Sequence, residues 1–295
     1  MLLTMMLFLG LAPTSSPDQW SKSYTVDGPP TLRVETGDGN VHVRPSEGGT
    51  IEARVTTENW KIGGDGIQIV DRQNGNEVEI SIKFPRRWFS LEFHRRRVDV
   101  ELIVPRHLTL KLRTGDGNVD ARGISGDLQL WTGDGKIELE DLDGKIRAET
   151  GDGGVYMSRA KGDVYLHSGD GKIEVIDHDG ALKVETGDGP VRVSGRFDSL
   201  AVKTGDGRVE AVAQSGSRLL SDWTVRTGDG GLTMKVAEDL AADVDLHTGD
   251  GKIELGIPVN VIGKTDNKSL KGKLNSGGKL LTLQSGDGSI RLLKL

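Results

Sequence analysis

Glycines recur every nine residues through the middle of this chain, and that spacing limits what the chain can fold into. Apolar residues stand two and four positions after each of these glycines, with polar or charged residues between them. Such alternation is the pattern of a half-buried strand. Each unit is therefore predicted to be one short strand and one tight turn. The glycines are Gly117, Gly126, Gly135, Gly144, Gly153, Gly162, Gly171, Gly180, Gly189 and Gly207, and only Asp198 interrupts the series.

The turns between these strands alternate in sequence, so the full repeat is 18 residues. Every second turn is Thr-Gly-Asp-Gly or Ser-Gly-Asp-Gly, whereas the turns between them differ from one another. A unit repeated at a fixed period must stack on its neighbours, because one unit alone cannot bury its apolar face. The fold class predicted is all-β. Specifically, we expect a single-chain parallel β-helix, or β-solenoid, with about 18 residues, two short strands and two tight turns in each coil.

Three parts of this solenoid differ in regularity. Irregular coils are expected over 17–112, the regular repeat over 113–212, and coils with loop insertions and a cap over 213–295, all within one continuous domain, 17–295. After Gly207 the turn motif starts at Thr227, Thr248 and Ser285, and the extra residues should emerge as loops. Leu292, Leu293 and Leu295 are predicted to cover the open end of the core.

The N-terminus indicates export. Residues 1–12 are an apolar run too short to span a bilayer, followed by small and polar residues, which predicts a signal peptide over 1–16. The alternative is a buried or disordered N-terminus. No other segment could cross a membrane once the signal is removed, so the periplasm or the cell surface is the expected location.

Composition excludes several kinds of function. The chain has no Cys, which excludes disulfides, thiolate metal sites, a cysteine nucleophile and a lipidated cysteine anchor. Its net charge of −6 argues against nucleic acid as a partner. Nucleophile-elbow, zinc-protease and phosphate-loop motifs are absent, and the six histidines are scattered, as expected of surface residues. The acids follow the repeat instead of gathering at a cleft, so neither catalysis nor a cofactor is predicted.

The turn aspartates could have either of two roles. Stacked at 18-residue intervals, they would form a column of like charges. Each could accept hydrogen bonds from its own turn, or the column could hold divalent cations, as in nonapeptide calcium rolls. The aspartates precede the repeat glycine, and basic residues such as Lys136 and Lys172 follow two positions later, which favours structural turns. The column comprises Asp116, Asp134, Asp152, Asp170, Asp188 and Asp206.

A basic and aromatic segment over 86–97 breaks both the repeat and the acidic balance. Such a mixture could bind phosphates or an anionic membrane through guanidinium contacts and aromatic insertion. The alternative is an edge hairpin whose solvated arginines discourage strand pairing. The candidate binding residues are Arg86, Arg87, Trp88, Phe89, Phe93, Arg95, Arg96 and Arg97.

The repeated Thr-Gly-Asp-Gly-x-Val/Ile, the run from Val98 to Arg106, and the segment from Asp239 to Ile253 that closes on Ser285-Gly-Asp-Gly-Ser-Ile together resemble the bacterial DUF4097 family. That family is provisionally described as β-strand-repeat adhesins. The likeness covers roughly residues 30–295. It implies an exported β-helical envelope protein, and it supplies no catalytic residues.

These observations predict an exported, non-enzymatic and monomeric β-solenoid that serves as a cell-envelope binding or adhesin-like module. Its expected partner is an anionic envelope polymer, a lipid surface or a surface protein. One alternative is a β-helix carbohydrate-active enzyme, which would place a few unique acids in a cleft. A second alternative is a self-assembling scaffold that stacks through open β edges.

Overall fold

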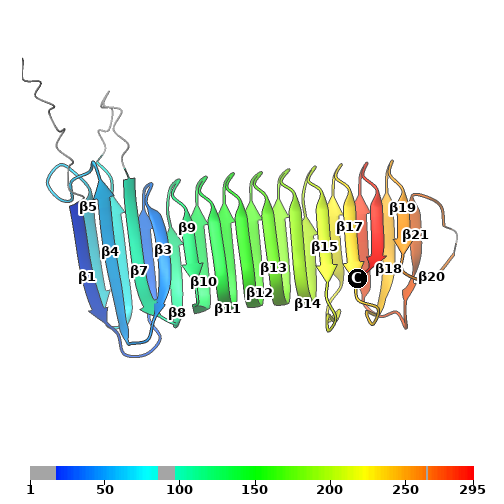
Figure 1. Ribbon diagram of the computed structural model, residues 1–295, viewed down its shortest axis with the longest axis horizontal. Helices are drawn as coiled ribbons and strands as arrows, with labels where there is room; N and C mark the ends of the chain where they lie inside the picture. Colours follow the sequence, from blue (N-terminus) through cyan, green and yellow to red (C-terminus); the bar gives the residue numbers. More distant parts are fainter. Residues whose placement is uncertain (1–17, 86–96, 264) are drawn as a thin grey trace, which may run out of the picture.

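The computed structural model describes residues 18–85, 97–263 and 265–295 of the chain. These residues form 23 strands connected in one hydrogen-bonded sheet, and they contain no helix. Figure 1 shows the strands side by side across the long axis of an elongated, solenoid-like body. The all-β prediction is confirmed.

Two long faces make up the body. The strands that lead into the Thr-Gly-Asp-Gly or Ser-Gly-Asp-Gly turns, with β5, β6, β20 and β21 added at the ends, form one of them, called here the pre-turn face. In order along the axis it consists of β5 (Gln68–Asn74), β6 (Glu77–Lys83), β2 (Thr31–Thr36), β8 (His107–Arg113), β10 (Ser125–Thr132), the second halves of β11 (Ile137–Thr150), β12 (Val155–Ser168), β13 (Ile173–Thr186) and β14 (Val191–Lys203), then β16 (Trp223–Thr227), β22 (Leu280–Ser285), β18 (Ala242–Thr248), β21 (Ser269–Leu274) and β20 (Asn260–Val261).

The strands that follow those turns form the post-turn face, with β1, β4 and β7 added at one end. In order it consists of β1 (Asp18–Thr25), β4 (Thr50–Glu58), β7 (Arg97–Pro105), β3 (Asn40–Ser46), β9 (Val119–Arg122), the first halves of β11 to β14, β15 (Val209–Ala213), β17 (Leu232–Val236), β23 (Ile290–Lys294) and β19 (Ile253–Gly256).

Equivalent residues of successive repeats lie beside one another. From β10 to β13 the strands pair in parallel, and Leu128 pairs with Ile146, Ile146 with Val164, and Val164 with Leu182. The register shifts where β13 meets β14, on either side of the segment from His178 to Gly180. That shift lies beside Asp198, the residue that interrupts the glycine series. The interruption of the glycine series at Asp198 thus coincides with a local shift in the pairing of β13 with β14.

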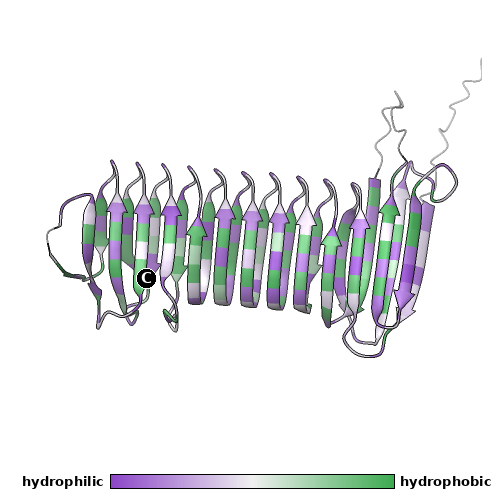
Figure 2. Ribbon diagram, turned by 180° about the vertical axis from the view of Figure 1, so that it is seen from behind, coloured by the Kyte–Doolittle hydropathy of each residue, from purple (hydrophilic) through white to green (hydrophobic). Residues whose placement is uncertain are grey.

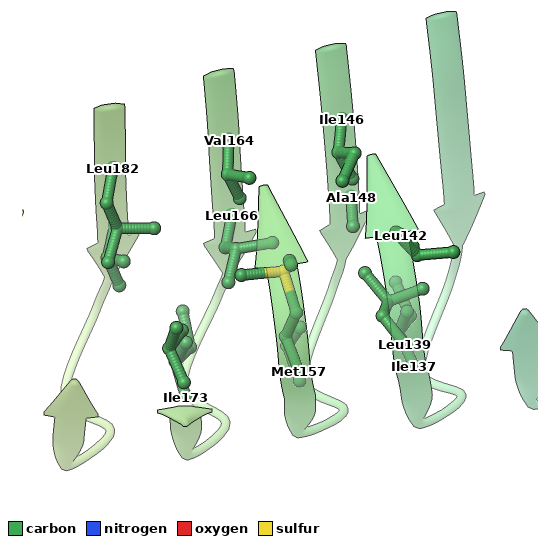
Figure 3. Packing of buried hydrophobic residues seen from close by; sticks show 14 of the residues in the cluster. Ile137, Leu139, Leu142, Ile146, Ala148, Met157, Val164, Leu166, Ile173 and Leu182 are labelled. Carbon is green, nitrogen blue, oxygen red and sulfur yellow. The ribbon is translucent and has the colours of Figure 1, made fainter. Parts of the chain in front are cut away.

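The core fills the space between the two faces. Buried and exposed residues alternate along each strand, as a period of two requires. Figure 2 shows this as bands of opposite hydropathy along the strands. Figure 3 shows side chains from both faces, among them Leu139, Ile146 and Met157, directed into the interior, where each is at most 1% exposed. Burial of such side chains is the main source of stability for stacked coils.

The order of coils in space differs from their order in the chain at both ends. The coil of β2 and β3 lies between the coil of β6 and β7 and that of β8 and β9. Likewise the last coil, β22 and β23, lies between β16 and β17 on one side and β18 and β19 on the other. Figure 1 accordingly places the C-terminus short of the end of the solenoid.

The prediction that the C-terminal leucines close the core is therefore wrong. Leu292 pairs with Met234 on one side and Leu255 on the other, inside the stack. Antiparallel strands lie at the ends instead: β21 pairs with β18 at one end, and β1 and β5 pair with β4 and β6 at the other. Reversing strand direction interrupts the parallel template that an open solenoid edge would offer to another coil.

Candidate functional site

One edge of the solenoid is built from ten Thr-Gly-Asp-Gly or Ser-Gly-Asp-Gly turns stacked in line. The first residue of each turn is buried, and in nine of the ten turns its hydroxyl donates to a glycine carbonyl of the adjacent coil. Thr132 Oγ1 lies 2.7 Å from Gly117 O, and Thr150 Oγ1 lies 2.8 Å from Gly135 O. The same contact recurs at Thr114, Ser168, Thr186, Thr204, Thr227, Ser285 and Thr248.

This ladder of hydroxyls starts at Thr36, whose coil is the first of the ten. The Thr36 hydroxyl is buried and has no hydrogen-bond partner among the described residues, and on the coil beyond it Phe84 lies against Gly37. In nine of the ten turns, all but that of Gly39, the second glycine is required by the spacing of the stack. A Cβ on Gly135 would lie 2.1 Å from Gly117 O, so no larger residue fits. The repeated tetrapeptide thus has a packing role.

The aspartates of the same turns form an exposed column along this edge. Asp206 N donates to Asp188 Oδ1 on the neighbouring coil, at 3.4 Å. Among the described residues, no other backbone N–H of the stacked turns donates to a carboxylate of this column. The predicted hydrogen bonds within each turn are not formed. The carboxylates of Asp206 and Asp287 raise the pKa of Asp229, because like charges disfavour ionisation. In the described part of the chain, no three His, Asp or Glu side chains converge as a bound metal ion requires.

A second feature lies on the pre-turn face, where four adjacent strands, β2, β8, β10 and β11, line a shallow hollow of about 320 Å³. We call it the basic-aromatic hollow. Its outward-facing lining consists of Arg33, Glu35, Lys111, Arg113, Gln129, Trp131, Arg147 and Glu149. Each strand contributes two of these side chains, because alternate residues of a strand share a face.

Stacking of cations on aromatic rings extends from the hollow along the same face. The Arg113 guanidinium lies 4.1 Å from the centroid of the Trp131 ring. On the next coils the Arg147 guanidinium lies 4.6 Å, and Lys183 Nζ 5.0 Å, from the centroid of the Tyr165 ring. Such contacts hold a cation close to an apolar surface and limit its motion. The face therefore presents rigid aromatic rings with fixed positive charges beside them.

Two of the cations in the hollow form no ion pair with any residue that the structure describes. In residues 18–85, 97–263 and 265–295, no carboxylate oxygen lies within 4.0 Å of Lys111 or Arg113. Arg147, by contrast, pairs with Glu149, and Arg33 Nη1 lies 4.0 Å from Glu79 Oε1. Lys111 and Arg113 are thus free to meet a ligand without first breaking an ion pair.

The hollow was not predicted from the sequence, although the 18-residue spacing of its side chains could have indicated it. Residues 18 apart become neighbours, so Arg113, Trp131 and Glu149 line up across three strands. Trp131 occupies a position that the strand pattern directs outward, where most coils carry a charged or polar residue. The 18-residue period that aligns the turn aspartates also aligns these outward-facing residues, so their proximity could have been predicted from the sequence.

Comparison with known proteins gives the family. The model of the family described as Toastrack DUF4097 matches residues 30–293, nearly the whole chain. The chain belongs to the DUF4097 family. The resemblance inferred from the repeated turns is therefore confirmed.

Solved structures give more distant likenesses to this DUF4097 chain. A protein from Parabacteroides distasonis, provisionally named as lipid binding, has 13% identity and a TM-score of 0.40, with 94% of this chain and 97% of that one covered. A provisionally named adhesin from Bacteroides fragilis has 10% identity and a TM-score of 0.34, with 96% and 100% covered. A provisionally named cell adhesion protein from Clostridium sporogenes has 13% identity and a TM-score of 0.27, with 95% and 100% covered. No curated protein shows detectable similarity to the chain.

The arginine-rich segment of the DUF4097 chain falls almost entirely outside the described residues. Arg86, Arg87, Trp88, Phe89, Phe93, Arg95 and Arg96 all belong to 86–96, so their role in binding stays a prediction. Arg97 is described: it begins β7, and its Nε lies 2.7 Å from Asp99 Oδ2. This arginine is thus engaged within the fold.

Among the histidines, His178 differs from the surface role expected of it. It is 1% exposed, its Nε2 lies 3.2 Å from Ala181 O, and its ring centroid lies 6.2 Å from that of Phe197. Burial lowers the pKa of His178, because the charged form is disfavoured away from water. The sequence did carry a signal for this burial: Leu142, Ala160 and His178 follow one another at 18-residue steps, pair in register and are all buried. Among the residues that the structure describes there is also no helix able to span a membrane.

Proposed function

We propose that this DUF4097 protein is exported and acts, without catalysis, as a binding or adhesin-like module of the cell envelope, in the periplasm or at the cell surface. The observation that carries this proposal is the pre-turn face, a long and regular surface that presents the basic-aromatic hollow. Regularly stacked coils create extended surfaces of this kind, which repeat proteins use for binding. The apolar run over 1–12 supports export.

Several features support binding without catalysis. A glycosidase brings two carboxyl groups together across a scissile bond. Here Glu35 lies on β2 and Glu149 on β11, the first and last of the four strands of the hollow, while Arg113 and Trp131 lie on the strands between them. His178, the histidine with a shifted pKa, is enclosed in the core and cannot meet a substrate. The side chains of the hollow are suited to recognition by charge and stacking.

We infer a parallel β-helix with 18 residues per coil in its central part, which the parallel registers Ile137 with Val155 and Val155 with Ile173 support. The internal ladder of hydroxyls would keep this scaffold straight, so that side chains on its outer face hold fixed spacings. A binding surface of preset geometry loses little entropy when a ligand docks.

Cell fractionation and binding to isolated envelopes test the function. The full chain, expressed in a bacterium, should appear in the periplasmic or surface fraction with residues 1–16 removed, and a variant that lacks those residues should stay in the cytosol. Purified protein should be retained on isolated envelopes in proportion to its concentration. An uncleaved, wholly cytosolic full chain would refute export. Absence of retention on envelopes or on whole cells would refute the binding role.

A further inference from the structure

We propose that the basic-aromatic hollow binds an extended acidic polysaccharide, one whose sugars carry carboxylate groups. This inference rests on the proposed envelope-binding function and names the ligand class for it. The shape of the hollow gives the first argument. It crosses four adjacent strands, and three strand spacings amount to about 14 Å along the solenoid axis. A shallow trough of that length suits a segment of a polymer that runs across the strands.

The charge of the hollow gives the second argument. Four cations, Arg33, Lys111, Arg113 and Arg147, face two carboxylates in a chain whose net charge is −6. Lys111 and Arg113 have no carboxylate oxygen within 4.0 Å among the described residues, so neither forms an ion pair there, although Glu35 stands opposite Arg113 on β2. A guanidinium binds a carboxylate through two parallel hydrogen bonds. The favoured ligand is therefore an anion.

The remaining polar and aromatic side chains select a sugar among anions. Gln129, Glu35 and Glu149 offer both acceptors and donors, which sugar hydroxyls require. Trp131 supplies an apolar ring whose position is held by the Arg113 guanidinium at 4.1 Å. Binding sites for small organic groups combine such a ring with a few convergent polar groups. One apolar surface beside several hydrogen-bonding groups matches the two kinds of surface on a sugar ring.

A lipid membrane fits this surface less well. Interfacial binding needs apolar side chains that project into the bilayer. Trp131 is only partly exposed. The described apolar residues that are more than half exposed, Leu220, Leu295, Ile262 and Val70, all lie outside the hollow, and Val70 is the one among them on the pre-turn face, on β5 at its end. The hollow can receive a polymer that lies along it, but it presents nothing that would enter a bilayer.

The same face provides a matched control. Lys203 and Arg226 stand at the rung position of Arg113, immediately before the turn, on coils farther along the axis. Within the described residues neither has a carboxylate oxygen within 4.0 Å, and neither has an aromatic ring stacked against it. A variant that removes these two charges changes the overall charge as much as one that removes Lys111 and Arg113.

The experiment measures binding of polygalacturonate oligosaccharides by titration calorimetry at low salt. Wild type should bind them, and neutral dextran should not bind. The double variant Lys111→Gln with Arg113→Gln should weaken binding about tenfold or more, and Trp131→Ala should do likewise. The double variant Lys203→Gln with Arg226→Gln should stay within about twofold of wild type. Raising the salt concentration should weaken binding, because screening reduces the attraction. Melting temperatures establish that each variant is folded, and the lysine and arginine changes, which lie on the surface, keep the test valid if Trp131→Ala unfolds.

Specific results would overturn the proposal. Equal loss in the hollow double variant and the control double variant would mean that net charge alone attracts the polymer. Binding to phosphatidylglycerol vesicles that exceeds binding to polygalacturonate and falls in the hollow variants would assign the site to lipid. If envelopes retain wild type and the hollow variants equally, the inference fails while the envelope-binding function stands. If envelopes retain no wild-type protein, the proposed function fails whatever the polysaccharide does.

Discussion

Replacing ladder threonines by valine tests whether the internal hydroxyls stabilise the stack. Thr132 and Thr36 occupy equivalent positions in their coils and are both buried. Thr132 Oγ1 lies 2.7 Å from Gly117 O and 2.9 Å from Gly115 O, whereas Thr36 Oγ1 has no hydrogen-bond partner in the described part of the chain. Valine has nearly the shape of threonine. The two substitutions therefore differ mainly in whether a hydrogen bond is lost.

The expected sizes follow from that difference. Loss of one buried hydrogen bond, with a carbonyl left unpaired, costs about 1–3 kcal/mol, so Thr132→Val should lower the free energy of unfolding by that amount. Thr36→Val removes a buried hydroxyl that is already unpaired, so its effect should be about zero or slightly stabilising. Thr132→Ser should lie close to wild type, because Ser168 makes the same contact, at 2.8 Å, two coils away.

Thermal and urea denaturation measure these effects. A loss of 1 kcal/mol lowers the melting temperature by roughly 2–4 °C in domains of 150–250 residues. Because stacked coils can unfold in parts, hydrogen exchange at the glycine amides beside each threonine should accompany the global measurement. Equal destabilisation by Thr132→Val and Thr36→Val would refute the reasoning, since it would show that the methyl group's packing, and not the hydrogen bond, sets the cost.

Three further predictions concern the turns and the core. Gly230→Ala should prevent close stacking, because its Cβ would lie 2.1 Å from Gly207 O, whereas Gly231→Ala meets no atom nearer than 3.8 Å and should be tolerated; similar melting temperatures for the two would contradict this. Burial lowers the pKa of His178, so the folded protein holds fewer protons there than the unfolded chain. The free energy of unfolding should then fall as the pH drops from about 6.5 towards the folded pKa. Urea titrations at several pH values should show that His178→Gln removes this part of the pH dependence. An unchanged pH dependence in the variant would contradict the prediction. Like charges raise the pKa of Asp229, so its ionised form opposes folding above that pKa and the penalty disappears below the ordinary aspartate pKa. Asp229→Asn should raise the melting temperature at pH 7 and low salt but leave it unchanged at pH 3, and no gain at pH 7 would show that solvent already screens the column.

The candidate site was less accessible to sequence reasoning than the fold. The turn motif predicted a role for its aspartates. In the structure, the contacts between coils are made instead by the threonine hydroxyl and the second glycine, such as Thr150 and Gly135. Hydrogen bonds between coils depend on which atoms face each other across the stack, and a repeat pattern does not state this. The basic-aromatic hollow likewise exists only when strands β2, β8, β10 and β11 lie in register.

The sequence by itself determined the strands, their period of two and the regular coils, because local alternation and glycine spacing leave few other ways to bury the apolar side chains. Tertiary structure alone decided the neighbours of the end coils. Every coil offers the same backbone ladder to the next, so the repeat cannot show that β2 lies between β6 and β8, or that β22 lies between β16 and β18. The burial of His178, by contrast, follows from the repeat itself, since Leu142 and Ala160, which precede it at 18-residue steps and pair in register, are buried too.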